Sequence, residues 1–126
     1  MSRKAVWVAG AVSVVIVLLG ARAFVDPVAA SASFGLPMHT DAETAFVRVY
    51  GARNAMLGAM TLLFALRGMI RPLMLVFALA TLLPLLDASV IVSRVGFGHE
   101  LARHAAILLV LAGVSVSLWR QRDASS

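Results

Sequence analysis

The sequence contains no cysteine and few charged residues. Without cysteine, the chain has no disulfide bond, no thiol redox chemistry and no thiolate metal site. Charged residues make up 13% of the chain, whereas soluble domains average about 25%. Hydrophobic residues make up 61% of only 126 residues, and a soluble domain this small exposes too much of its surface to hide them. We therefore expect one integral membrane domain over residues 1–126, with its apolar surface facing the lipid bilayer.

Acidic and aromatic residues are scarce as well. Six acidic residues stand against eleven basic ones, which gives a net charge of +5, and the aromatic residues are six Phe, two Trp and one Tyr. The basic residues are scattered beside apolar segments rather than gathered on one face, so the charge does not indicate a nucleic-acid partner. The three histidines are not spaced to share a helix face, and we expect no metal ion and no other cofactor.

Four apolar stretches are long enough to cross a membrane, which takes about 20 residues in helical form. The predicted spans cover residues 5–24, 45–66, 72–93 and 101–119. The second span is the least apolar of the four, because it contains Arg48, Arg53 and Asn54. The sequence therefore predicts an all-α fold in the form of a four-transmembrane-helix bundle.

Local patterns mark the ends of these helices. Thr40 and Glu43 have the spacing of a capping box, in which each side chain accepts a backbone N–H of the other residue. Pro72 fits the first turn of the third span, where a missing N–H costs nothing. Asp26 and Pro27 predict the start of a short helix that ends near Gly35 and lies in the membrane interface between the first and second spans.

The third span carries a proline in its interior. Pro84 leaves the carbonyl of Ala80 without its helical donor and should kink the helix. A hydroxyl such as that of Thr81 can help to satisfy the freed groups. The kink lies three residues before Asp87, so we expect it to aim this carboxylate inward.

The basic residues predict the orientation of the chain. One side of the membrane would hold Arg3, Lys4, Arg67, Arg71, Arg120 and Arg122. The opposite loops hold the acidic Asp26, Asp41 and Glu43, with Arg94 near the end of the third span. The excess of basic residues in short loops predicts that both termini are cytoplasmic, in the plasma membrane of a bacterium. An alternative interpretation is a cleaved signal peptide, with residues 21–23 as the cleavage site.

Two groups of residues in the spans are candidates for helix contacts or a site. Gly51, Ala55 and Gly58 form a stripe of small residues, which is typical of close helix packing in membranes. A second group consists of ionisable or polar residues that lie at membrane depth and form a buried polar cluster, namely Arg53, Asn54, Asp87 and His104. Ionisable groups at membrane depth are energetically costly, so they usually pair with another residue or belong to a functional site.

The polar cluster allows three interpretations. In the first, an Arg53–Asp87 ion pair locks the second span to the third, because buried ion pairs often fix register. In the second, the carboxylate, guanidinium and imidazole form a small-molecule or proton site that is open to the outer leaflet. In the third, each side chain reaches the headgroups independently.

Several short motifs occur in a recognisable order. They are residues 34–37 (Phe-Gly-Leu-Pro), residues 51–54 (Gly-Ala-Arg-Asn) with Gly58, residues 84–87 (Pro-Leu-Leu-Asp), and His104. In this order they resemble a family of small four-helix membrane proteins known as domain-of-unknown-function family 4267. The resemblance runs from the first span to Trp119 and implies four helices and a membrane, but no established activity. Asn54 stands where the family has an acidic residue, which puts a second carboxylate at this position in doubt.

These observations leave three hypotheses for function. The first is a non-enzymatic membrane protein that binds a lipid or a membrane partner, which includes a second copy of itself. The second is a membrane enzyme acting on a lipophilic small molecule, with Asp87 and His104 as acid and base and Arg53 holding an anionic group. The third is a small proton-coupled transporter; the small multidrug-resistance proteins have four helices too, but they place their key carboxylate in the first span, where this chain has none.

Overall fold

The computed structural model describes residues 3–125, without the side chains of residues 100 and 122–125, and the regular secondary structure of this part of the chain is entirely helical. The helices are α1 (Lys4–Val25), α2 (Pro27–Phe34), α3 (Asp41–Leu66), α4 (Ile70–Ala80), α5 (Leu82–Val95) and α6 (Glu100–Ser125). Four helical segments are long and apolar enough to span a membrane: α1, α3, α4 with α5, and residues 101–121 of α6. The predicted all-α architecture of four spans with a short helix between the first two is confirmed.

The capping box at the start of α3 is confirmed. The Thr40 hydroxyl accepts the backbone N–H of Glu43 at 3.2 Å, and the Glu43 carboxylate accepts the backbone N–H of Thr40 at 3.1 Å. The helix therefore begins at Asp41, four residues before the apolar stretch from which the second span was predicted. The first turn of α3 is polar and extends the helix beyond its apolar part.

The third span is interrupted at Thr81, between α4 and α5. Pro84 lies three residues further on and has no N–H to offer the carbonyl of Ala80, which explains the interruption. The Thr81 hydroxyl donates to the carbonyl of Phe77 at 2.8 Å. The prediction of a distortion caused by Pro84 is thus confirmed, although the hydroxyl serves the Phe77 carbonyl and not that of Ala80.

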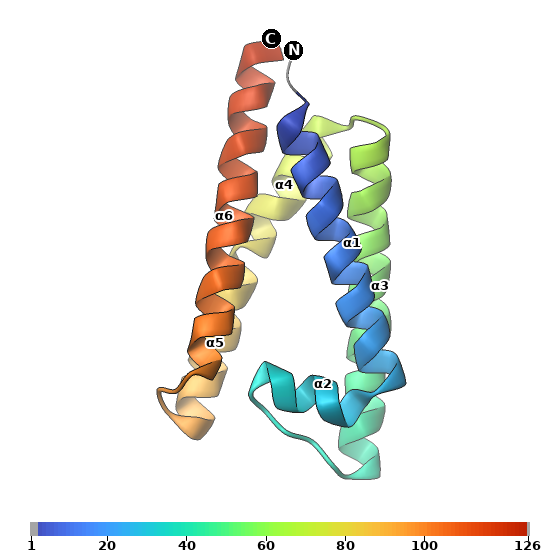
Figure 1. Cartoon of the computed structure of the whole chain (residues 1–126), viewed down its shortest axis with the longest axis vertical. Helices are drawn as coiled ribbons and strands as arrows, with labels where there is room; N and C mark the ends of the chain where they lie inside the picture. The colour runs from blue at the N-terminus through green and yellow to red at the C-terminus, as the bar shows by residue number, and fades with distance from the viewer. Residues whose placement is uncertain (1–2, 126) are drawn as a thin grey trace.

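The helices form two pairs that diverge from a common end (Figure 1). In the first pair, α1 packs along α3; in the second, α6 packs along α4 and α5. The two pairs meet at the end of the bundle that holds both termini, called here the termini end. Toward the opposite end the pairs separate, and α2 lies across the space between them (Figure 1). We call this the α2 end.

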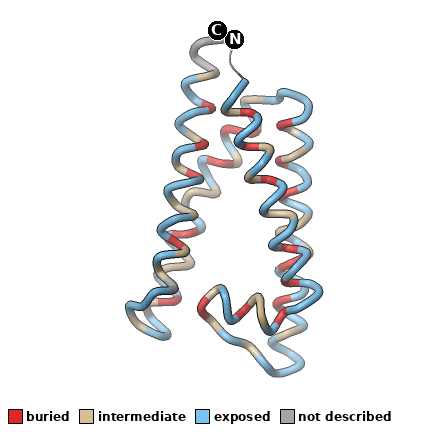
Figure 2. Tube along the Cα trace, in the orientation of Figure 1, coloured by how far each residue is buried: buried red, intermediate tan, exposed pale blue. Residues whose placement is uncertain are grey.

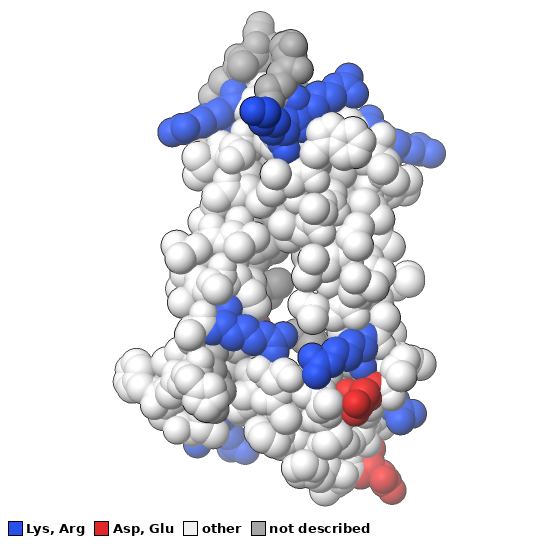
Figure 3. All heavy atoms as spheres, viewed as in Figure 1, with Lys and Arg blue, Asp and Glu red and all other residues white. Residues whose placement is uncertain are grey.

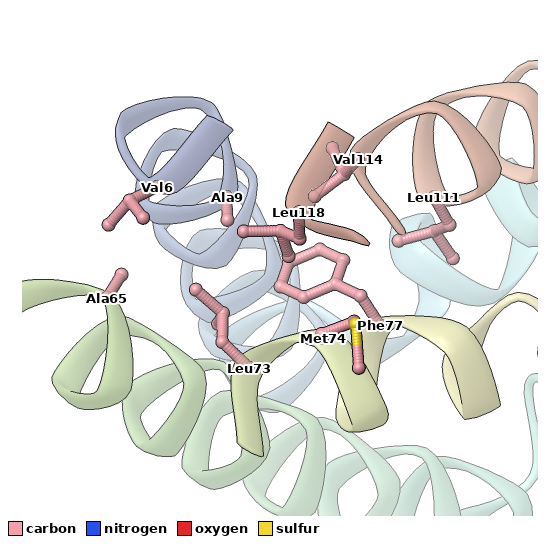
Figure 4. Close-up of a cluster of buried hydrophobic side chains, with 9 residues drawn as sticks. All are labelled: Val6, Ala9, Ala65, Leu73, Met74, Phe77, Leu111, Val114 and Leu118. Carbon is pink, nitrogen blue, oxygen red and sulfur yellow. The ribbon is translucent and has the colours of Figure 1, made fainter. Parts of the chain in front are cut away.

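An apolar core joins the two pairs at the termini end. It consists of side chains from four helices: Val6, Ala9, Ala65, Leu73, Met74, Phe77, Leu111, Val114 and Leu118. Figure 4 shows the Phe77 ring between α4 and α6, beside Leu118. Buried positions recur along each pair in Figure 2, but much of the remaining surface is exposed. This is the arrangement expected of helices that face lipid on their outer sides.

Glycine residues bring α1 and α3 into backbone contact. A Cβ atom on Gly20 would lie 2.5 Å from the backbone nitrogen of Ala55 and from the carbonyl oxygen of Gly51. A Cβ atom on Gly58 would lie 2.9 Å from the backbone nitrogen of Val17. The stripe of Gly51, Ala55 and Gly58 therefore lies against α1, with Gly20 as its counterpart on that helix. Such close approach is how helices associate in lipid, where the hydrophobic effect between them is absent.

A buried hydrogen bond also crosses the first pair. The Thr61 hydroxyl donates to the Ser13 hydroxyl at 2.8 Å, and Ser13 in turn donates to the carbonyl of Ala9 at 2.8 Å. Both hydroxyl residues are buried. The bond fixes the register of α1 against α3 near the middle of the bilayer.

Candidate functional site

The most buried ionisable side chain at the α2 end is that of His104 on α6, which is only 2% exposed. Its Nε2 atom lies 3.1 Å from the carbonyl oxygen of Phe34, the last residue of α2. The two rings also meet edge to face, with centroids 4.9 Å apart. Because a carbonyl can only accept a hydrogen bond, Nε2 must carry the proton and donate it. His104 thus attaches α2 to the second helix pair.

The other ring nitrogen of His104 is buried and has no hydrogen-bond partner among the described residues. With the proton on Nε2, the neutral imidazole presents Nδ1 as an acceptor. A buried polar atom left unpaired costs about 1–3 kcal/mol. Native proteins therefore rarely leave such an atom unsatisfied, and Nδ1 calls for a donor that is not part of the described chain.

Local sequence explains why the Phe34 carbonyl is available at this point. Asp26 caps the start of α2 by accepting the N–H of Ala29, and Gly35 ends the helix with a φ of 108°, which glycine adopts without strain. The Ser31 hydroxyl accepts the N–H of Met38, which holds the following loop against α2. The Phe34 ring also meets Tyr50 of α3 edge to face, at 6.4 Å between centroids.

Asp87 is the acidic residue of this site. It lies on α5, half-buried, and interacts electrostatically with His104. Helices α5 and α6 pack against each other, which brings the two residues together from separate spans. Asp87 and His104, both members of the predicted polar cluster, thus lie on neighbouring helices. We call the group formed by Phe34, Asp87 and His104 the α2-end site.

Basic residues lie beside the α2-end site. The Arg22 guanidinium, near the end of α1, donates to the Ser33 hydroxyl of α2 at 3.3 Å, one residue before Phe34. Arg103 directly precedes His104 on α6 and is half-buried. Figure 3 shows basic side chains on both sides of a hollow in the half of this face nearer to α2. Arg22 therefore brings positive charge to α2, next to Phe34 in the sequence.

Arg53 does not take part in this site. It is exposed on α3 and lines a shallow groove of about 440 Å³ with Ala52, Met56 and Leu57. No ion pair joins it to Asp87 in the part of the chain that the structure describes, so the predicted Arg53–Asp87 pair is wrong. The reason is the helix pairing: Asp87 lies on α5, which packs along α6, whereas α3 packs along α1.

Asn54 is half-buried on α3, and among the described side chains no hydrogen bond joins it to Asp87 or His104. The structure thus brings two of the four predicted residues together and leaves Arg53 and Asn54 on another helix. Sequence reasoning overlooked Arg22 as a neighbour of the site. It also gave no role to the Phe34 carbonyl, because a backbone acceptor at the end of a helix has no signature in the side chains.

The described residues include no group of three or more His, Cys, Asp or Glu side chains arranged to hold a metal ion. Four apolar helices with a polar site at one end define an integral membrane protein of the small helical-bundle class. The family model described as "Domain of unknown function (DUF4267)" matches residues 13–118, so the chain belongs to this family. The match includes every residue of the α2-end site. No curated protein and no solved structure matches the chain.

Proposed function

We propose that this membrane protein binds, without chemical turnover, a lipophilic molecule whose polar head donates a hydrogen bond to His104. The observation that supports the proposal is the buried Nδ1 atom of His104, an acceptor without a partner among the described residues. The molecule would lie between the two helix pairs, next to α2. We further propose that the termini are cytoplasmic, as the basic termini end suggests, so that the ligand comes from the opposite leaflet.

The chemistry of the site narrows the head group. Nδ1 and the Asp87 carboxylate are both acceptors, which favours a ligand that carries an O–H group. Arg22 donates to Ser33, one residue before Phe34, and favours an oxygen with negative charge or high electron density on this side of the site. An alcohol meets both requirements: its O–H donates to Nδ1, and its remaining lone pairs accept from a guanidinium. The apolar helices on either side suit a hydrocarbon tail.

The enzymatic hypothesis loses Arg53, the residue that it assigned to the substrate, although Arg22 offers another guanidinium near α2. The enzymatic hypothesis needs a guanidinium to hold an anionic substrate group next to the acid and the base. Arg53 lies on another face of α3, so it does not supply this group. The acid–base pair of Asp87 and His104 remains, and hydrolysis or isomerisation of a bound ligand is the finding that would replace binding by turnover.

Native mass spectrometry of the protein, released gently from membranes, tests the proposal. Two variants separate the two ring nitrogens. In His104→Gln the amide N–H₂ replaces Nε2 and keeps the bond to Phe34, but no acceptor replaces Nδ1. In His104→Asn the amide oxygen can replace Nδ1, and the bond to Phe34 is lost.

We expect a bound mass on the wild-type protein that is lost in His104→Gln, although this variant keeps the thermal stability of the wild type. We expect His104→Asn to retain part of the bound mass and to be less stable. A wild-type protein without any adduct, together with an unperturbed His104→Gln variant, would assign Nδ1 to a bound water molecule and refute the proposal. An adduct present equally in both proteins would place the ligand elsewhere.

A further inference from the structure

An open groove of about 870 Å³ lies between α1 and α6 at the termini end, far from the α2-end site along α6. Val8 of α1 and Leu109, Val110 and Gly113 of α6 line its deeper part, while Lys4 and Arg120 line its mouth. Its volume falls within the roughly 300–1,000 Å³ that are common for small-molecule sites. We call it the α1–α6 groove.

The α1–α6 groove has the polarity profile of one membrane leaflet. From Leu109 to Arg120 the α6 backbone advances about 17 Å at 1.5 Å per residue. Half of a typical hydrocarbon core is about 15 Å. The groove therefore begins in the middle of the bilayer with aliphatic side chains and reaches the headgroup level at its two basic residues.

Two exposed tryptophans mark the level of the groove mouth. Trp7 and Trp119 are 71% and 57% exposed, and they lie one helical turn from Lys4 and directly next to Arg120. Tryptophan is enriched where the hydrocarbon core meets the headgroups. Figure 3 shows that Lys and Arg side chains gather at this end of the molecule. A negatively charged headgroup would thus meet a basic surface.

We propose that the α1–α6 groove binds an anionic phospholipid from the leaflet at the termini end. One acyl chain lies along Val8, Leu109 and the open strip at Gly113, and the phosphate is held by Lys4 and Arg120. This site is independent of His104 and of the function proposed above. Charge favours a lipid over a second copy of the chain. A second copy docked symmetrically on this groove would bring the same basic residues to its mouth, and the like charges would repel each other.

Gly113 provides a way to close the groove without disturbing the helices. A Cβ atom built on Gly113 meets nothing within 4 Å, in contrast to the glycines between α1 and α3. A leucine at this position would extend into the groove and occupy the path of the acyl chain. It also favours the helix, because leucine has a higher helix propensity than glycine.

Tryptophan fluorescence measures lipid contact at the level of the groove mouth, because Trp7 and Trp119 are the two tryptophans of the chain and both lie at this level. The protein is reconstituted into phosphatidylcholine vesicles that contain a minor fraction of brominated phosphatidylglycerol, or the same fraction of brominated phosphatidylcholine. Bromine quenches tryptophan on contact. We expect the anionic lipid to bind more tightly, by about fivefold for each of the two basic residues at the mouth.

Three variants identify where the preference arises. We expect the double variant Lys4→Gln, Arg120→Gln to lose the preference for phosphatidylglycerol over phosphatidylcholine, since both charges are removed. We expect Gly113→Leu to lose it as well, although its charges are intact, while Gly113→Ala keeps most of it. The control Arg67→Gln, Arg71→Gln removes the same charge from the same end but leaves the groove residues unchanged, and it should retain the preference.

The outcomes separate a built site from general attraction to a basic surface. A preference that survives in Gly113→Leu would show that the lipid does not occupy the groove. A preference that falls equally in the Arg67/Arg71 control would assign it to net charge alone. Either result overturns the proposal, as does equal quenching of the wild-type protein by both lipids. If Gly113→Leu folds poorly, the comparison of the Lys4/Arg120 double variant with the Arg67/Arg71 control still decides between the groove and net charge.

Discussion

The two helix pairs are held together by different means. In the first pair, Gly20, Gly51 and Gly58 let the backbones of α1 and α3 touch, and a buried hydrogen bond crosses between them. In the second pair, large side chains such as Phe77, Ile91 and Leu118 fill the space between α6 and the interrupted α4–α5 span. One pair is in close backbone contact around Gly20, Gly51 and Gly58, and the other is packed through large side chains.

This difference locates the parts of the molecule that can move relative to each other. The pairs share an apolar core at the termini end. At the α2 end, the contact between His104 and Phe34 links them through α2. A rigid first pair and a second pair with a break at Thr81 form two arms joined at one end. A ligand bound between the two helix pairs at the α2 end would therefore lie far from the apolar core that joins them, where a change in the distance between the pairs disturbs less packing.

The largest effect should come from placing the same side chain in each pair. Gly20→Leu forces its Cβ atom against backbone atoms of Gly51 and Ala55, which cannot yield without separating the helices. We expect a loss of about 3 kcal/mol or more, at or beyond the upper end of ordinary overpacking. Gly113→Leu meets open space and should change stability by about 0.5 kcal/mol or less. Loss of helicity on titration with sodium dodecyl sulfate measures both.

Equal destabilisation by the two leucines would remove the distinction between the pairs. It would mean that α6 at Gly113 is as closely packed as α1 at Gly20. A stable Gly20→Leu variant would show that α1 and α3 do not approach through their glycines.

A smaller effect is expected from the hydrogen bond within the first pair. Thr61→Val removes the hydroxyl that donates to Ser13 but keeps the shape of the side chain, and Ser13 retains its own bond to Ala9. Interhelical hydrogen bonds in membranes contribute about 0.6 kcal/mol on average and up to about 1.7. We expect a loss in this range by the same detergent titration. Ser117→Ala is the control, because the Ser117 hydroxyl bonds only to the carbonyl of Gly113 on its own helix. A similar loss in the control would assign the effect to the hydroxyl itself and not to the helix contact.

Features that depend on neighbouring residues were predictable from the sequence. The capping box of Thr40 and Glu43, the start of α2 at Pro27 and its end at Gly35 all arise from contacts within a few residues. The four spans follow from length and hydropathy, because every backbone group in the bilayer must be paired within its own helix. These parts of the fold require no knowledge of which helices are neighbours.

Features that depend on helix pairing were not predictable in the same way. Ser13 lies in a run of valines, and its isolated polarity signals a contact but does not name Thr61 as the partner. Gly20 became meaningful only when α1 was found opposite the stripe of α3. The Phe34 carbonyl is a backbone group and carries no signal of its own. The α2-end site was therefore accessible from sequence only through Asp87 and His104.

The Arg53 prediction failed because depth was considered without direction. Arg53 and Asp87 both lie at membrane depth, which is necessary for an ion pair within the bilayer but not sufficient. The stripe of Gly51, Ala55 and Gly58 had already assigned one face of α3 to a neighbouring helix. Once α1 occupies that face, Arg53 points to the opposite side. The helix pairing decides the outcome, because α5, which carries Asp87, packs along α6, and the sequence of α3 does not reveal this pairing.

The smallest expected effect is that of Arg53→Gln, because Arg53 and Asp87 belong to different helix pairs. Arg53→Gln should leave stability within about 0.5 kcal/mol of the wild type, as for a surface substitution, because no described carboxylate pairs with it. The double variant Arg53→Gln, Asp87→Asn should then equal Asp87→Asn alone, since the two residues lie on different arms and do not interact. A double-mutant cycle with the detergent titration measures this coupling. Coupling of 1 kcal/mol or more would mean that Arg53 does meet Asp87. Within the arrangement described here that requires a second copy of the chain, whose Asp87 reaches the exposed Arg53 across an interface.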